Sequence, residues 1–273
     1  IFFALTLVSC LFVGAQMWEW VGASGQVNFN LLDGAPFAAS MLAILVSHEF
    51  GHYLTARRLG SSTSLPYFIP MPFGPFGTLG AFIRMAVPPR NRRHLLAVGA
   101  AGPLAGLAVA LPLLWLGLSL SRVQPLPPAG YQMEGTSLLY AAVKYLMFGK
   151  FLPSGGEDVF IHPVAFAAWA GLLVTGLNLI PAGQLDGGHI VYALLGRQGA
   201  RRVTWMVLAG LAGLSFFWPG WLLWLGLVLL FGRMQDMPLD ELTELTRRQR
   251  LFAAAMVAVF ALVFTPIPLT IMP

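Results

Sequence analysis

The sequence has few charged residues and a single cysteine. Asp, Glu, Lys and Arg make up 10% of the 273 residues, whereas 57% are hydrophobic. A soluble domain carries about 25% charged residues, so this shortage of charge excludes an ordinary soluble domain and indicates a polytopic membrane protein. Cys10 alone cannot form an internal disulfide or a cysteine-based zinc site, so any metal must be held by His and carboxylate side chains.

The sequence also lacks a basic surface of the kind that binds nucleic acid. The formal net charge is only +5, and no aromatic residues are interleaved with the basic ones. The arginines gather between hydrophobic runs, at 57–58, 84–93, 197–202 and 233–250. This distribution is typical of membrane topology, so we expect the lipid bilayer as a partner and no nucleic acid.

Hydrophobic runs predict an all-α polytopic fold, with about seven transmembrane helices in one domain over residues 1–273. The first four runs are 1–20, 36–59, 95–120 and 164–180, the last continued by 186–195. Three additional C-terminal spans lie within 203–269, at 203–218, 221–232 and 251–269. The chain opens at Ile1 within apolar sequence, so we interpret it as a trimmed fragment with an incomplete first span. The arginine groups all fall on the cytoplasmic side only if 121–163 makes no net crossing, so a short helix at 137–151 is expected to stay outside the bilayer.

The segment 60–93 is not expected to be helical. Its six prolines and several glycines interrupt any helical pattern, yet 65–73 and 79–87 are apolar and rich in β-forming residues. Such backbone is tolerated beside a membrane site only where it is buried in protein or lines a cavity. We therefore expect a re-entrant loop or a β-hairpin, whose free edge pairs with an extended peptide. The alternative is a surface loop with no substrate role.

The central motif is Ser47-His48-Glu49-Phe50-Gly51-His52, within the apolar run 36–56. Two imidazoles four residues apart on a helix lie on one face, so both can reach a single metal ion. The Glu49 carboxylate can take a proton from a metal-activated water, as in the H-E-x-x-H zinc proteases. With five His and six Glu in the chain, the motif has a chance expectation of roughly 0.002.

A catalytic zinc usually takes three protein ligands and one water, so a further ligand is expected. Among the remaining histidines and the few acids in apolar sequence, Asp186 stands out. The sequence distance from Asp186 to Arg197 is nearly that from His48 to Arg57, and the latter corresponds to roughly 13 Å of helix below the cytoplasmic surface. Two polar groups at the same depth can meet. We assign no ligand role to His94 or His162.

The chain resembles the site-2 protease family of intramembrane zinc metalloproteases (peptidase family M50). The resemblance rests on His48-Glu49-Phe50-Gly51-His52, on Asn178-Leu179-Ile180-Pro181 and on Leu185-Asp186-Gly187-Gly188-His189. It extends to the glycine-proline element Gly99-Ala100-Ala101-Gly102-Pro103, and it covers a metalloprotease core at about 36–195.

The resemblance implies one Zn²⁺ per chain, bound by His48, His52 and Asp186, with Glu49 as the base and Asn178 near the scissile carbonyl. It also implies hydrolysis of transmembrane protein substrates within the bilayer by an integral, multi-pass protein with its active site nearer the cytoplasmic face. Other interpretations stay open for three residues. Asp186 is also a favourable helix N-cap, Asn178 can satisfy backbone groups freed by Pro181, and His189 can either orient a ligand or simply pack.

Two competing functions remain at this level. One is a membrane zinc protease whose third ligand is a downstream glutamate, for which Glu241 and Glu244 in the charged stretch are the candidates. The other is a non-catalytic membrane metal-binding protein, such as a transporter or an inactive scaffold. Glu49 separates the second alternative from a protease, because a site that only holds a metal does not need a general base.

Overall fold

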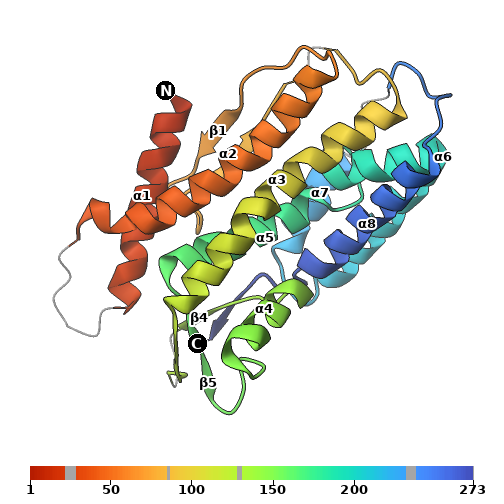
Figure 1. Cartoon of the computed structure of the whole chain (residues 1–273). Coiled ribbons are helices and arrows are strands. Elements are labelled where there is room, and N and C mark those ends of the chain that lie inside the picture. Colours follow the sequence, from red (N-terminus) through yellow and green to blue (C-terminus); the bar gives the residue numbers. More distant parts are fainter. Residues whose placement is uncertain (22–28, 85–86, 128–130, 232–237, 273) are drawn as a thin grey trace.

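The computed structural model describes residues 1–21, 29–84, 87–127, 131–231 and 238–272, and its architecture is mostly helical (Figure 1). The helices are α1 (Phe2–Val21), α2 (Ala35–Arg58), α3 (Arg92–Ser119), α4 (Leu138–Phe148), α5 (Pro163–Asn178), α6 (Asp186–Leu214), α7 (Trp221–Phe231) and α8 (Arg247–Val263), with a 3-10 turn at Leu31–Gly34. Short strands, which an all-α prediction does not include, form three antiparallel pairs. They are β1 (Tyr67–Pro70) with β2 (Thr78–Phe82), β3 (Arg122–Pro125) with β5 (Glu157–Phe160), and β4 (Tyr131–Glu134) with β6 (Leu269–Met272).

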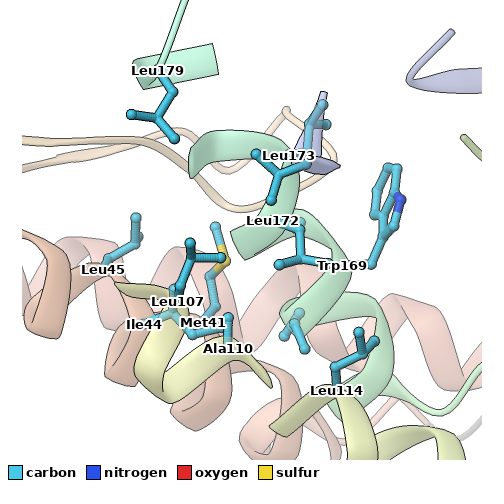
Figure 2. Packing of buried hydrophobic residues seen from close by; sticks show 14 of the residues in the cluster. Met41, Ile44, Leu45, Leu107, Ala110, Leu114, Trp169, Leu172, Leu173 and Leu179 are labelled. Carbon is cyan, nitrogen blue, oxygen red and sulfur yellow. The ribbon is translucent and has the colours of Figure 1, made fainter. Parts of the chain in front are cut away.

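Helices α2, α3 and α5 pack side by side and form the centre of the molecule (Figure 2). In α2 and α3 the buried residues recur mostly every three or four positions, so each presents one face to its neighbours, whereas the buried residues of α5 run continuously from Ala167 to Leu173. The facing side chains include Met41, Ile44 and Leu45 of α2, Leu107, Ala110 and Leu114 of α3, and Trp169, Leu172 and Leu173 of α5.

Two of the described helical segments, Leu31–Arg58 and Arg92–Ser119, are long and apolar enough to cross a membrane. Shorter apolar helices of 10–17 residues lie at Phe2–Met17, Leu138–Phe148, Pro163–Asn178 and Trp221–Leu230. At 1.5 Å per residue, the 24 residues of α2 rise about 36 Å, enough for a hydrocarbon core of about 30 Å. Helix α4 has 11 residues and rises only about 16 Å.

The first half of α6 is tied to the start of α3. Helix α6 bends at Gly196, whose φ of 70° and ψ of −177° interrupt the helical hydrogen bonds. Arg92 compensates for this break, because its Nε donates to the Ala193 carbonyl (2.9 Å) and its Nη2 donates to the Leu194 carbonyl (3.1 Å). The two helical runs predicted at 186–195 and 203–218 therefore remain two helices, which meet at a kink at Gly196.

The segment that follows α2 contains a β-hairpin, one of the two forms predicted for it. In the antiparallel register, Tyr67 faces Phe82 and Phe68 faces Ala81, and a turn at 71–77 joins the two strands. Strand β1 packs against α1, and β2 contacts α2. The predicted segment 60–93 includes residues 85–86, which lie outside the described residues. The hairpin is thus attached to the helix that carries the His-Glu motif.

The two ends of the helical bundle differ in composition. The C-terminal end of α2 and the first turns of α3 and α8 lie at one end, with exposed arginines such as Arg57, Arg93 and Arg248 (Figure 1). The segment 238–246 is irregular and bound to this end, because the Asp240 N–H donates to the Arg90 carbonyl (2.8 Å).

Helix α4 and strand β5 lie at the other end, around a buried charged cluster (Figure 1). Lys144, only 1% exposed, contacts Asp158 at 2.9 Å and Glu134 at 3.5 Å. The Tyr140 hydroxyl donates to Glu134 (2.7 Å), and burial raises the pKa of the Glu134 carboxyl above its ordinary value. These contacts fix α4 against strands β4 and β5.

Candidate metal centre

Helix α2 places both histidines of the motif inside the bundle. His48 and His52 are one turn apart, and their exposed fractions are 4% and 7%. Their Nε2 atoms lie 3.2 Å from each other, with the rings inclined at 69°. Helix α2 runs unbroken from these residues to Arg57, which places His48 about two and a half turns and His52 about one and a half turns from the arginine-rich end.

Asp186 reaches the same point from a break between α5 and α6. The carbonyl and N–H groups of the break bond locally, as in the contact from the Ala182 N–H to the Ile180 carbonyl (2.7 Å). The first turn of α6 packs closely on this break, because a Cβ on Gly187 would overlap the Leu179 carbonyl oxygen. The N-cap of α6 is Leu185, so Asp186 does not act as the cap and its carboxylate is available to the site.

The carboxylate of Asp186 completes a nearly equilateral triangle of ligand atoms. Its Oδ2 lies 3.3 Å from Nε2 of His48 and 3.3 Å from Nε2 of His52. The first turn of a helix is also a favourable place for a negative charge. His48, His52 and Asp186 are therefore positioned to bind a metal ion.

The spacing of these atoms fits zinc. Two imidazole nitrogens and one carboxylate oxygen are the donor set of many catalytic zinc sites, with metal–ligand distances near 2.0–2.1 Å. Tetrahedral ligands at that distance are separated by about 3.3–3.4 Å from one another. The three separations here are 3.2, 3.3 and 3.3 Å. Three protein ligands also leave the fourth tetrahedral position for water or substrate.

A backbone group in α3 sets the tautomer of His52. The Nδ1 atom of His52 lies 2.8 Å from the carbonyl oxygen of Val98, and this pair is buried. A carbonyl oxygen only accepts hydrogen bonds, so Nδ1 carries the proton and Nε2 keeps its lone pair for a metal. No pattern in the sequence points to Val98, because its contribution comes from the main chain.

Glu49 and Asn178 lie beside the three candidate ligands. Glu49 is 6% exposed and directly follows His48 on α2. Asn178, the last residue of α5, places its Nδ2 3.3 Å from Nε2 of His48. The structure therefore brings together every candidate site residue of the sequence: His48, Glu49, His52, Asn178 and Asp186.

The other candidates lie elsewhere. The Tyr192 hydroxyl donates to Glu241 (2.6 Å), and exposed Glu244 pairs with Arg250 (2.7 Å), so neither glutamate belongs to the triangle. His162 is the N-cap of α5, where its Nδ1 accepts from the Val164 N–H. His189 lies three residues after Asp186 in α6 and packs closely on α3, because a Cβ on Gly99 would lie 2.9 Å from the His189 Cβ.

A buried triangle of candidate metal ligands with an adjacent carboxylate, set in an apolar helical bundle, is the arrangement found in metallopeptidases of the H-E-x-x-H class. The model of peptidase family M50 matches residues 36–217, and the chain belongs to this family.

Curated relatives of the chain are named as zinc metalloproteases. It is 38% identical over 202 residues to the probable zinc metalloprotease EGY2, chloroplastic, of Arabidopsis thaliana, covering 70% of this chain and 35% of that protein. It is 33% identical over 244 residues to the probable zinc metalloprotease EGY1, chloroplastic, of Oryza sativa subsp. japonica, covering 86% and 40% respectively. The chain thus spans little more than a third of the length of these relatives. No solved structure gives a significant match.

Proposed function

We propose that the chain is an intramembrane zinc metalloprotease, with one zinc held by His48, His52 and Asp186. The observation that carries the proposal is the triangle of ligand atoms with sides of 3.2–3.3 Å, buried next to the Glu49 carboxylate. A binding site alone needs only the triangle. The additional buried carboxylate supports hydrolysis, because a general base is what peptide cleavage requires beyond a metal.

In the proposed mechanism, Glu49 moves the proton. Bound zinc supplies a Lewis acid that lowers the pKa of a water molecule and polarises the substrate carbonyl. Glu49 accepts the proton of the attacking water and returns it to the leaving amine. Val98 holds His52 through Nδ1, and the Asn178 amide, beside His48, donates to the oxygen of the scissile carbonyl as negative charge develops there.

We place the arginine-rich end of the bundle on the cytoplasmic side and propose seven crossings. They are formed by α1, α2, α3, α5 with the first half of α6, the second half of α6, α7 and α8. The exposed arginines at one end and the short α4 at the other support this arrangement. His48 then lies about nine residues, or roughly 13 Å, from the cytoplasmic surface.

The proposed substrates are transmembrane protein segments in an extended conformation. A helix engages its own carbonyl groups, so the scissile segment must unwind before it can be cleaved. The β1–β2 hairpin offers a way to hold an unwound segment, since in the described part of the chain neither outer edge pairs with another strand. Leu79 on β2 is 66% exposed, which gives an apolar surface for such a segment.

The experiment that tests the function compares wild type with Glu49→Gln. The amide has the shape of the carboxylate but cannot act as a base. We expect Glu49→Gln to retain zinc. Its rate of cleavage of a membrane-spanning reporter should fall by at least about 10²–10⁴-fold. Glu244→Gln, in the exposed pair with Arg250, serves as the control and is expected to cleave normally. Cleavage by Glu49→Gln at the wild-type rate would leave a non-catalytic metal-binding role and overturn the proposal.

A further inference from the structure

Helix α3 passes α2, the helix of His48 and His52, at the level of the metal centre. Glycines in α3 make this close approach possible. A Cβ on Gly102 of α3 would overlap three ring atoms of His52, namely Nε2, Cδ2 and Cε1. Nε2 is the atom of His52 that faces the other two ligands. The obstruction is therefore not the flexible end of a side chain, which could turn aside, but the ligand atom itself.

The same stretch of α3 also holds His52 from its other nitrogen. The Val98 carbonyl accepts from Nδ1 at 2.8 Å, and Val98 lies one helical turn before Gly102. These two contacts restrict the ring in complementary ways. The carbonyl fixes its tautomer and tilt, and the missing side chain at Gly102 provides the volume that the ring occupies.

One turn further along α3, Gly106 faces the other imidazole. A Cβ there would lie 3.3 Å from both Cβ and Nδ1 of His48. A contact of this length is tight, but a shift of a few tenths of an ångström relieves it. Both ligand histidines thus lie against glycine positions of α3, and the Gly102 position tolerates an added atom far less than the Gly106 position.

We propose that Gly102 is a positioning residue of the metal centre: together with the Val98 carbonyl it fixes His52 in its zinc-binding orientation. Gly106 does the same, more weakly, for His48. This inference rests on the proposed function, since it takes zinc as the ion that the site binds. It goes further in assigning part of the zinc affinity to a helix that contributes no ligand.

The test measures metal binding and not cleavage, so it is independent of the catalytic proposal. Zinc affinity is determined by chelator competition, and the visible spectrum of the Co²⁺-substituted protein reports ligand geometry. We expect Gly102→Ala to bind zinc about 10–100-fold more weakly than wild type, with an altered Co²⁺ spectrum. Gly106→Ala should lose about threefold to tenfold, in line with its milder contact.

Gly117→Ala is the matched control for damage to helix packing. Gly117 lies on the same helix, far from the site, and a Cβ there would overlap the backbone N of Ala165 in α5. We expect Gly117→Ala to lower the unfolding temperature of the metal-free protein while the folded protein keeps wild-type zinc affinity and the wild-type Co²⁺ spectrum. Gly210→Ala, with open space around its Cβ, should leave the unfolding temperature, the zinc affinity and the Co²⁺ spectrum unchanged.

Two results would overturn the inference. One is wild-type zinc affinity and an unchanged Co²⁺ spectrum in folded Gly102→Ala. The other is a loss of zinc affinity in Gly117→Ala as large as that in Gly102→Ala, which would assign the effect to general packing. If Gly102→Ala does not fold, Gly106→Ala decides, and wild-type affinity in that variant contradicts the proposal.

Discussion

Asn178 lies at the point where α5 ends and the backbone turns towards Asp186. Its amide nitrogen is 3.3 Å from Nε2 of His48, so it reaches the same small volume as the three candidate ligands. An amide is a weak zinc ligand but a good hydrogen-bond donor. This position suits a group that stabilises charge on a substrate oxygen rather than one that holds the metal.

We expect Asn178→Ala to keep its zinc and to lose about 10²–10³-fold in kcat for reporter cleavage, the usual cost of removing one such donor. Metal analysis and cleavage kinetics on the same preparation separate the two effects. A variant with normal kcat would show that Asn178 only satisfies backbone groups near Pro181. A variant without zinc would show that the amide supports the metal centre itself.

Single residues of the site could be predicted from the sequence to different degrees. His48, Glu49 and His52 are recognisable because a helix fixes their relation locally. Asp186 required an argument about depth in the membrane, and the structure places its carboxylate against both imidazoles. The Val98 carbonyl could not be predicted, because main-chain contacts between helices leave no pattern in residue types.

At the scale of elements, the β1–β2 hairpin is the clearest link between local sequence and proposed substrate binding. Gly80 in β2 has a φ of +103°, a conformation that only glycine adopts without strain, and a Cβ there would meet nothing within 4 Å. A substitution at Gly80 therefore changes the backbone of the strand without creating a clash.

We predict that Gly80→Val lowers kcat/KM for an extended substrate by about tenfold or more, since strain of this kind costs of order 1–3 kcal/mol at the strand edge. Zinc content should stay at the wild-type level. Gly149→Val is the matched control, because Gly149 also has a positive φ (69°) and open space, but it ends α4 at the opposite end of the molecule. Equal kcat/KM in the two variants would mean that the hairpin has no substrate role.

The sequence predicted elements well where one residue type dominates and less well where tertiary contacts decide. Proline and glycine ruled out a helix after α2 but did not choose between a loop and a hairpin. The kink at Gly196 agrees with the predicted end of a helical run at Leu195, but the Arg92 side chain that bonds the carbonyls there could not be predicted, because it is distant in sequence. The segment 238–246 is irregular, and its N–H groups at Leu239 and Asp240 bond the chain before α3.

At the scale of the whole molecule, the positions of the exposed arginines predict which end of the bundle faces the cytoplasm, and this can be tested. Exposed Arg57, Arg201 and Arg248 belong to the proposed cytoplasmic side, whereas Lys150 follows α4 at the other end. Cys10 is the only cysteine and is buried, so a Cys10→Ala background gives a chain without thiols. Single cysteines can then be introduced one at a time.

With a thiol reagent that does not cross membranes, we predict that Arg57→Cys, Arg201→Cys and Arg248→Cys are labelled from the same face of sealed vesicles. Lys150→Cys should be labelled only from the opposite face. Labelling after detergent solubilisation controls for accessibility of each thiol. If Lys150→Cys reacts from the same face as Arg57→Cys, α4 lies on the wrong side and the proposed number of crossings is incorrect.

The central claim is that side chains from α2 and α6 share one zinc ion, and the metal content of purified variants tests it most directly. We predict one zinc per chain in wild type, in Glu241→Gln and in Glu244→Gln, and nearly complete loss in Asp186→Asn, whose amide keeps the shape of the carboxylate but not its charge. A full complement of zinc in Asp186→Asn, together with loss in either glutamate variant, would contradict the account.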